Sequence, residues 1–173
     1  MGFAFGITKH LIFLILQAIV FLFVVIATPL AVYRSPLTNA CYTMWGYKLN
    51  CDSTSVQASW SCNQQRDTMR AAAAFSIISI FFSLISTALA ALSLFCNMRL
   101  SNMILFVLSV LIVFTLMVCW ACIAHVHDAN VCSPISGGSI GRFYGYGAGF
   151  GLLVTSWVVQ ILASILAGLM TFV

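Results

Sequence analysis

Charged residues are scarce in this chain. Seven of its 173 residues are Lys or Arg and three are Asp or Glu, which makes 6% charged, whereas an ordinary soluble domain has about 25%. A soluble globular fold cannot cover its surface with so few charges. The basic residues are too dispersed for a nucleic-acid-binding surface, and the 62% of hydrophobic residues excludes a disordered chain. The composition is that of a membrane protein.

Four long stretches of the chain contain no charged residue. These stretches predict membrane spans over residues 11–32, 71–95, 103–124 and 148–173. Each exceeds the roughly 20 residues that cross the hydrocarbon core, and the first is too long for a signal peptide. Larger loops then cover residues 33–70 and 125–147. We therefore expect residues 1–173 to form a single tetraspan domain in a lipid bilayer.

Ionisable side chains are missing from the interior of these spans. Proton relays, voltage sensors and most coupled transporters depend on such residues, so active transport is disfavoured. Gln17 and Gln160 are the most polar residues within the spans. They are too far apart in expected depth to pair directly, so each is expected to bond a nearby backbone carbonyl or hydroxyl.

The second span carries a repeat of small residues at alternating spacings of three and four. Its members are Ala72, Ser76, Ser79, Ser83, Ser86, Ala90 and Ser93. This heptad seam predicts close, left-handed packing against neighbouring helices. A polar pore lining is the alternative, which is weaker because serine hydroxyls can bond back to their own helix.

Two rules disagree on the orientation in the membrane. A count of positive residues would place the two large loops inside, because most basic residues lie there. Four cysteines also lie there, and disulfides persist in oxidising compartments; they are Cys41, Cys51, Cys62 and Cys132. The charge bias is small, so we follow the cysteines. We expect both termini in the cytoplasm and the large loops outside, in the plasma membrane.

Catalytic motifs are missing as well. There is no nucleophile elbow, His-Glu-x-x-His or Walker loop, so we expect neither an enzyme nor a cofactor. The glycine-rich stretch 141–147 reads as an aromatic approach to the fourth span rather than a phosphate loop. A weak metal candidate is the run Cys119, Cys122, His125, His127, Asp128 and Cys132, in which His125 and His127 could chelate. Free cysteine is common in membrane helices, so no metal site is assigned.

The segment from Cys41 to Cys51 is the most informative part of the sequence. The two cysteines are equidistant from Gly46, so a hairpin turning there would place them at a separation that a disulfide can bridge. Alternatively, they lie on neighbouring strands of a small sheet. A disulfide between them would close a ring of eleven residues and contribute about 2.5–3 kcal/mol to the stability of the folded protein. Nearby aromatic rings can cap the sheet or rest at the membrane surface; they are Tyr42, Trp45, Tyr47 and Trp60.

This segment closely resembles the signature of the amastins, tetraspan surface proteins of kinetoplastid parasites. The matching residues are Cys41, Tyr42, Thr43, Trp45, Gly46, Lys48, Asn50 and Cys51, and Met44 stands where Leu or Phe is expected. The resemblance extends over the four spans to Trp157 in the last of them. Amastins in turn look like claudins. This implies an all-α membrane fold, a left-handed four-helix bundle with a small disulfide-bonded sheet outside the membrane.

The remaining outer cysteines, Cys62 and Cys132, are expected to form a second disulfide. Each large loop holds one of them, and small outer domains with little core commonly rely on disulfides. Amastins are described as glycoproteins, yet this sequence has no Asn-x-Ser/Thr site, only the poor matches at Asn39 and Asn130.

The expected function is non-enzymatic contact at the cell surface. The signature residues Tyr42, Thr43, Trp45, Gly46, Lys48 and Asn50 would act in host–parasite or membrane–membrane contact, through self-association or host membrane components. The alternative is a claudin-like ion or small-solute channel, with a path lined by Lys48, Asp52, Arg66 and Asp67. A metal-binding surface protein, using His125 and His127, is the third hypothesis.

Overall fold

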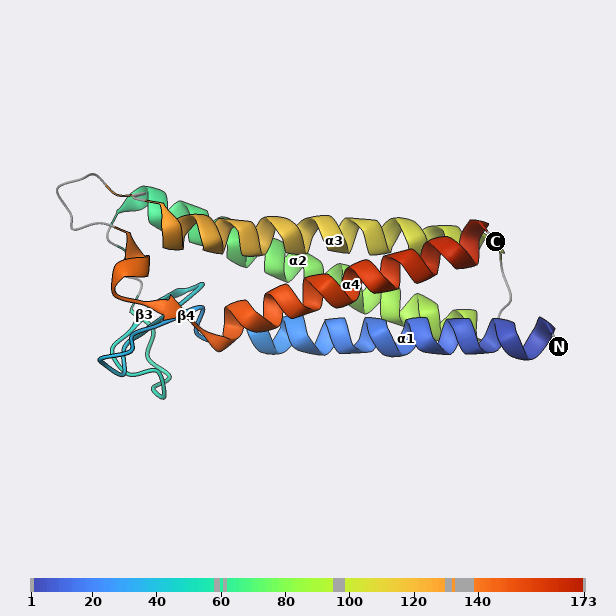
Figure 1. Cartoon of the computed structure of the whole chain (residues 1–173), viewed down its shortest axis with the longest axis horizontal. Coiled ribbons are helices and arrows are strands. Elements are labelled where there is room, and N and C mark those ends of the chain that lie inside the picture. Colours follow the sequence, from blue (N-terminus) through green and yellow to red (C-terminus); the bar gives the residue numbers. More distant parts are fainter. Residues whose placement is uncertain are drawn as a thin grey trace.

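The protein is a bundle of four helices with a small sheet at one end. The structure, a computed structural model, describes residues 2–57, 60, 62–94, 99–129, 132 and 139–172. Its helices lie side by side along the long axis (Figure 1) and are α1 (Gly2–Ala27), α2 (Asn63–Ser93), α3 (Arg99–Asp128) and α4 (Ala148–Phe172). All four are long and apolar enough to cross a membrane. The fold expected from the sequence, a tetraspan bundle with a small sheet, is confirmed.

The helices do not begin and end where the charge-free stretches do. α1 ends at Ala27 rather than at residue 32, because Pro29 has no amide to continue the helical hydrogen bonds. α2 starts at Asn63 and α3 continues to Asp128, so residues 63–70 and 125–128 are helical where loops were expected. Phe95 and Val173, the expected last residues of the second and fourth spans, lie outside the described residues.

The serine face of α2 is filled by its neighbours. Ser76, Ser79, Ser83 and Ser86 are fully buried. The hydroxyls of Ser76 and Thr28 on α1 are 2.7 Å apart, and Ser79 donates to Thr115 on α3 at 2.8 Å. These contacts support the packing interpretation of the small-residue seam, because close helix approach and interhelical hydrogen bonds are what stabilise bundles in lipid.

A polar layer lies deeper in the bundle. Its members are fully buried and come one from each helix: Gln17, Ser86, Ser109 and Gln160. Gln17 and Ser86 lie about 15 Å further from the sheet than the Thr28–Ser76 contact, at 1.5 Å per residue. Gln160 Nε2 donates to the backbone carbonyl of Ser109 at 3.4 Å, as expected. The bond expected for Gln17 is not found, since neither of its amide atoms has a hydrogen-bond partner in the part of the chain that the structure describes.

Replacing Gln17 with leucine is therefore expected to stabilise the protein by about 1 kcal/mol. The change removes the desolvation cost of an unpartnered buried amide and keeps most of the side-chain volume. The free energy of unfolding can be measured by denaturant titration of detergent-solubilised protein. Gln160→Leu is the matched control and should gain less stability, because it loses the hydrogen bond to the Ser109 carbonyl. A lower stability for Gln17→Leu would contradict the prediction.

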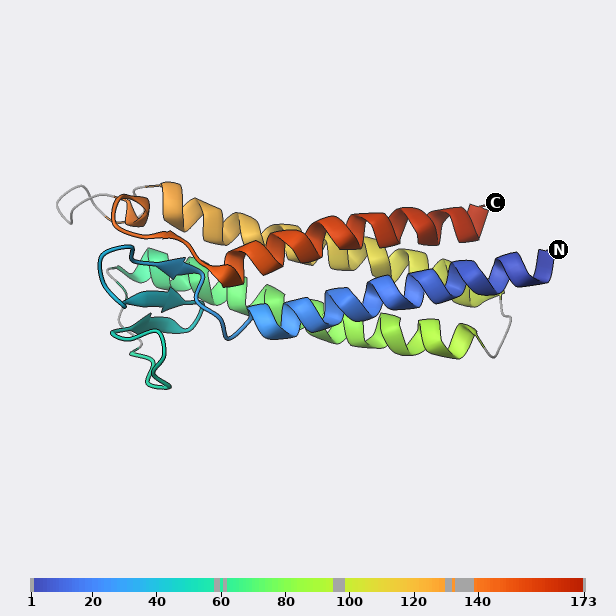
Figure 2. The same ribbon diagram turned by 60° about the horizontal axis from the view of Figure 1, so that its bottom comes forward.

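The sheet joins the two large loops. Its strands are β1 (Tyr33–Arg34), β2 (Cys41–Thr43), β3 (Gly46–Lys48) and β4 (Gly145–Tyr146), in the order β3-β2-β1-β4 with antiparallel pairs. Figure 2 shows the strands grouped at the end of the bundle opposite both termini; we call this the sheet end. Tyr33 and Met44 are buried with bundle residues in one hydrophobic core, so the sheet is held against the helices.

The turn of the central hairpin differs from the expected one. Thr43 pairs with Gly46 and Cys41 pairs with Lys48, so the chain turns at Met44 and Trp45. The expectation of a turn at Gly46 with the two cysteines opposite each other is wrong. Cys51 lies beyond β3, outside the strands, where its amide donates to the Asn39 carbonyl at 2.9 Å.

Candidate functional site

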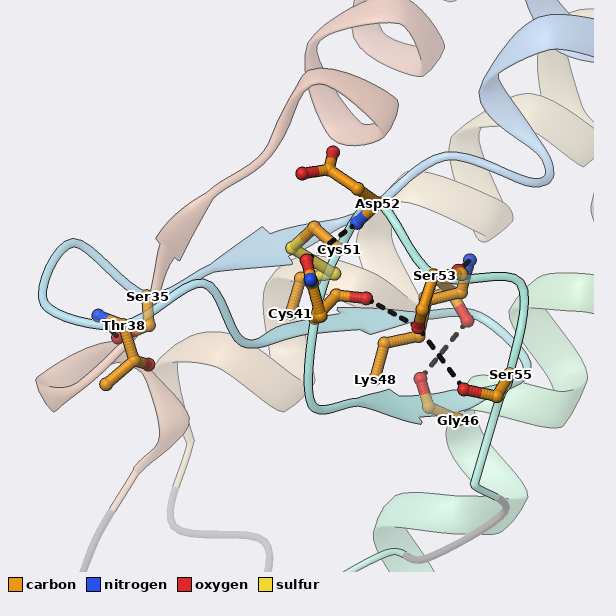
Figure 3. Close-up of a disulfide and its surroundings, with 11 residues drawn as sticks. Ser35, Thr38, Cys41, Gly46, Lys48, Cys51, Asp52, Ser53 and Ser55 are labelled. Carbon is orange, nitrogen blue, oxygen red and sulfur yellow. Dashed lines mark hydrogen bonds between the residues drawn. A yellow bond between two sulfur atoms is a disulfide. The ribbon is translucent and has the colours of Figure 1, made fainter.

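Two disulfides hold the sheet end. Cys41 is bonded to Cys51, with 5.6 Å between the Cα atoms, and this ring closes the hairpin onto itself (Figure 3). Cys62 is bonded to Cys132, with 5.8 Å between the Cα atoms. Cys62 immediately precedes α2 and Cys132 follows α3. The second bond therefore links the chain at the sheet ends of these two helices.

Most signature residues bond within their own segment. Thr43 Oγ1 donates to the Gly46 carbonyl at 3.1 Å and accepts from the Trp45 amide at 3.2 Å. Asn50 Oδ1 accepts from the amide of Asp52 at 3.1 Å. These bonds provide partners for backbone N–H and C=O groups in turns, where no neighbouring strand supplies them. The roles of Thr43 and Asn50 in the structure are thus to shape the loop.

Lys48 is also turned inward. Its Nζ donates to the carbonyl of Ser53 at 3.0 Å, as Figure 3 shows, and its side chain is half-buried. Lys48 lines a groove of about 260 Å³ with Arg34 and Asp52 beside the first disulfide. Arg66 and Asp67 instead pair with each other on α2, at 3.4 Å. The structure does not gather the four charged residues of the channel alternative at one place.

Gly46 occupies a position that only glycine fits. Its φ is +154°, which L side chains rarely adopt. A Cβ atom there would collide with the carbonyl oxygen of Gln57. That oxygen accepts from the Tyr47 amide at 2.9 Å, and the Gln57 amide donates back to Tyr47 at 2.8 Å. Gly46 therefore allows the chain after β3 to return across the hairpin.

Aromatic rings connect the two large loops. The ring centroid of Tyr42 lies 5.0 Å from Tyr47, 5.4 Å from Trp60 and 5.1 Å from Tyr144. Burial, and then the neighbouring Tyr47, raises the pKa of Tyr42; burial is also the main cause that raises the pKa of Tyr144 to about 12. These phenols stay neutral at physiological pH. Tyr144 was not identified from the sequence, although its position just before the fourth span in an aromatic run was a usable signal.

Tyr33 anchors the sheet to the bundle. It is fully buried, and its hydroxyl donates to the backbone carbonyl of Ile123 on α3 at 2.5 Å. Its edge meets Tyr42 in the neighbouring strand, with 6.5 Å between centroids. The sequence did not single out Tyr33, because a two-residue strand has no hydrophobic period to detect.

Several large apolar side chains are exposed at the sheet end, among more numerous polar ones. Leu37 is 91% exposed, Leu49 66%, Phe143 63% and Trp45 48%. Leu37, Leu49 and Phe143 lie in or beside turns rather than on the long helices, and we call these three the tip residues. These large apolar side chains lie outside the membrane-facing surface and are available for contact with a partner.

The weak metal candidates do not assemble into a site. His127 Nδ1 lies 2.6 Å from Asp128 Oδ1, and Nε2 lies 3.0 Å from the Tyr144 carbonyl oxygen. The His127 ring stacks on Tyr146, with centroids 4.0 Å apart, while His125 is exposed and Cys132 is bonded to Cys62. Within the described ranges, no three His, Cys, Asp or Glu side chains are grouped to hold a metal ion.

The fold and the sheet end together define a multi-pass membrane protein of the tetraspan class, with a disulfide-bonded sheet at one end of four apolar helices. A family model described as Amastin surface glycoprotein matches residues 18–166, and the chain therefore belongs to this family. This confirms the resemblance inferred from the signature segment. Comparisons with curated proteins and with solved structures gave no match.

Proposed function

We propose that this amastin is a non-enzymatic surface protein whose sheet end contacts a second membrane or a second copy of the chain. The sheet end faces the outside, and the termini face the cytoplasm. Host membrane components are the expected partners in the first case. The helices anchor the protein in the bilayer and hold the sheet in place.

The observation that carries this proposal is the exposure of the tip residues. Leu37, Leu49 and Phe143 are each more than half exposed, although the segment around them is fixed by disulfides and hydrogen bonds. Fully burying one such side chain contributes about 1.5–3 kcal/mol. Segments that are already held in place lose little conformational entropy on binding, which favours association.

The two disulfides support the orientation. All four bonded cysteines belong to the sheet end or to the segments that flank α2 and α3 there. Disulfides persist in the oxidising space outside the cell rather than in the cytosol. Contact is favoured over conduction through one bundle because the serine face of α2 is filled by α1 and α3.

The triple variant Leu37→Ser/Leu49→Ser/Phe143→Ser is expected to weaken association by at least about tenfold, since roughly 1.4 kcal/mol corresponds to that factor. The full chain would be placed in proteoliposomes. Their clustering with each other, and with vesicles of host plasma membrane, would be followed by light scattering. The removal of three apolar contact groups is the physical reason for the loss.

A matched control removes apolar groups elsewhere. Leu22 on α1 and Leu162 on α4 are 54% and 55% exposed on the helices, so Leu22→Ala/Leu162→Ala should cluster like the native protein. Equal losses in both variants, or no clustering of the native protein with either type of vesicle, would refute the contact function.

A further inference from the structure

A second cavity lies beside the sheet, at the start of the apolar part of α2. It has a volume of about 330 Å³, and its lining includes Met44, Trp45, Trp60, Arg66, Arg70 and Ile77. Of these lining residues, Met44 is buried and Trp45 is 48% exposed. Trp60 is fixed by stacking on Tyr42, with 5.4 Å between ring centroids. This cavity is separate from the groove beside the first disulfide.

The cavity carries an excess of positive charge. Arg66 and Arg70 are one turn apart on α2, so their side chains share a face of the helix. Asp67 lies 3.4 Å from Arg66 Nε, but both side chains are well exposed, at 39% and 65%, and such surface pairs are weak. Arg70 forms no ion pair within the described residues. The other two carboxylates are engaged elsewhere: Asp52 lines the disulfide groove, and Asp128 lies against His127.

The cavity also lies where the charged start of α2 meets its charge-free part, which is the expected boundary between water and hydrocarbon. The charge-free part of α2 begins at Ala71, directly after Arg70. Ile77 lies about 16 Å further along the axis than Arg66, at 1.5 Å per residue. Phe81, one turn beyond Ile77, is 60% exposed and continues the apolar face. Tryptophan rings favour this depth, because they are apolar with one polar N–H group.

We propose that this cavity binds one phospholipid from the membrane leaflet at the sheet end. Its phosphate lies between the guanidinium groups of Arg66 and Arg70, its polar head lies beside Trp45 and Trp60, and an acyl chain follows Ile77 and Phe81. Guanidinium groups match phosphate oxygens in charge and in hydrogen-bond geometry. The apolar floor selects a phosphate that carries a lipid chain over free phosphate, which has no group to place there.

The test uses the full chain purified in detergent and native mass spectrometry with phosphatidylglycerol as the probe. We expect one phosphatidylglycerol to bind per chain. Diacylglycerol with the same acyl chains, which lacks the phosphate, should bind at least about tenfold more weakly, because it cannot form charge-assisted hydrogen bonds with the two guanidinium groups. Inorganic phosphate at millimolar concentration should not displace the lipid.

The double variant Arg66→Gln/Arg70→Gln should bind phosphatidylglycerol about tenfold more weakly or worse. Both side chains lie at the surface, and thermal unfolding would verify that the variant is folded. Arg34→Gln is the matched control, since Arg34 is exposed and lines the other groove; its lipid affinity should be unchanged.

Four results would overturn the proposal. Equal affinity for diacylglycerol would show that the lipid phosphate does not contribute to binding. Equal losses of lipid affinity in Arg34→Gln and the double variant would show that Arg66 and Arg70 have no specific role in it. Displacement by inorganic phosphate would define a simple anion site. A dimer that disappears in the double variant would assign the cavity to a second copy of the chain.

Discussion

Gly46→Ala is expected to destabilise the sheet end by about 3 kcal/mol. A methyl group at this position combines a backbone conformation that L residues avoid with a collision against the Gln57 carbonyl oxygen. Relief of the collision would break the paired hydrogen bonds between Tyr47 and Gln57. The free energy of unfolding would be measured by denaturant titration, with tryptophan fluorescence as the probe because Trp45 and Trp60 report on this region.

Gly145→Ala is the control for this substitution. Gly145 also lies in a strand of the sheet, but a Cβ atom there would meet no atom within 4 Å. It should unfold like the native protein, and the helical circular dichroism of both variants should be native. Equal stability of the two variants would show that the return of the chain across the hairpin does not need glycine.

Replacing both Cys41 and Cys51 with serine is expected to cost about 3 kcal/mol. Their separation is 10 residues, and closing a ring of this size removes that much chain entropy from the unfolded state. The ring lies between α1 and α2, so its residues are free to move once the sheet unfolds. The double variant would be compared with native protein by the same titration under non-reducing conditions.

The disulfide between Cys62 and Cys132 closes the longer loop but is expected to contribute less to stability than the one between Cys41 and Cys51. Cys62 and Cys132 are 70 residues apart, and the chain-entropy relation alone would give them the larger effect, about 4 kcal/mol. However, α2 and α3 fill most of that interval, and membrane helices remain helical when their packing is lost. Cys62→Ser/Cys132→Ser should therefore cost less than Cys41→Ser/Cys51→Ser. The opposite order would mean that these helices unwind on denaturation.

The membrane helices could be predicted because hydrocarbon penalises charge so strongly. The same criterion could not find the ends of the helices. Arg66, Asp67 and Arg70 belong to α2 but lie before its charge-free part, so the absence of charge marks the hydrocarbon rather than the helix. In the same way, the ionisable residues His125, His127 and Asp128 lie in the last turns of α3.

The sheet was harder to predict than the helices. β1 and β4 have two residues each, too few for an alternating pattern, and their pairing depends on contacts between distant parts of the chain. Gly46 was placed at the turn because it lies midway between Cys41 and Cys51, whereas in the structure it leaves room for the carbonyl of Gln57. The signature pattern does not show whether a residue faces inward, as Lys48 does, or outward, as Trp45 does.

The pairing of β4 with β1 has a consequence for the order of biosynthesis. The β2–β3 hairpin and its disulfide involve residues 41–51 only, so they can form while the ribosome is still making α2. β4 pairs with Tyr33 and Arg34 but is encoded just before α4. β1 thus keeps one edge unpaired until the third span and the second large loop have been synthesised. A chain that ends before residue 145 would therefore leave the hydrogen-bonding groups on that edge of β1 without their partner strand.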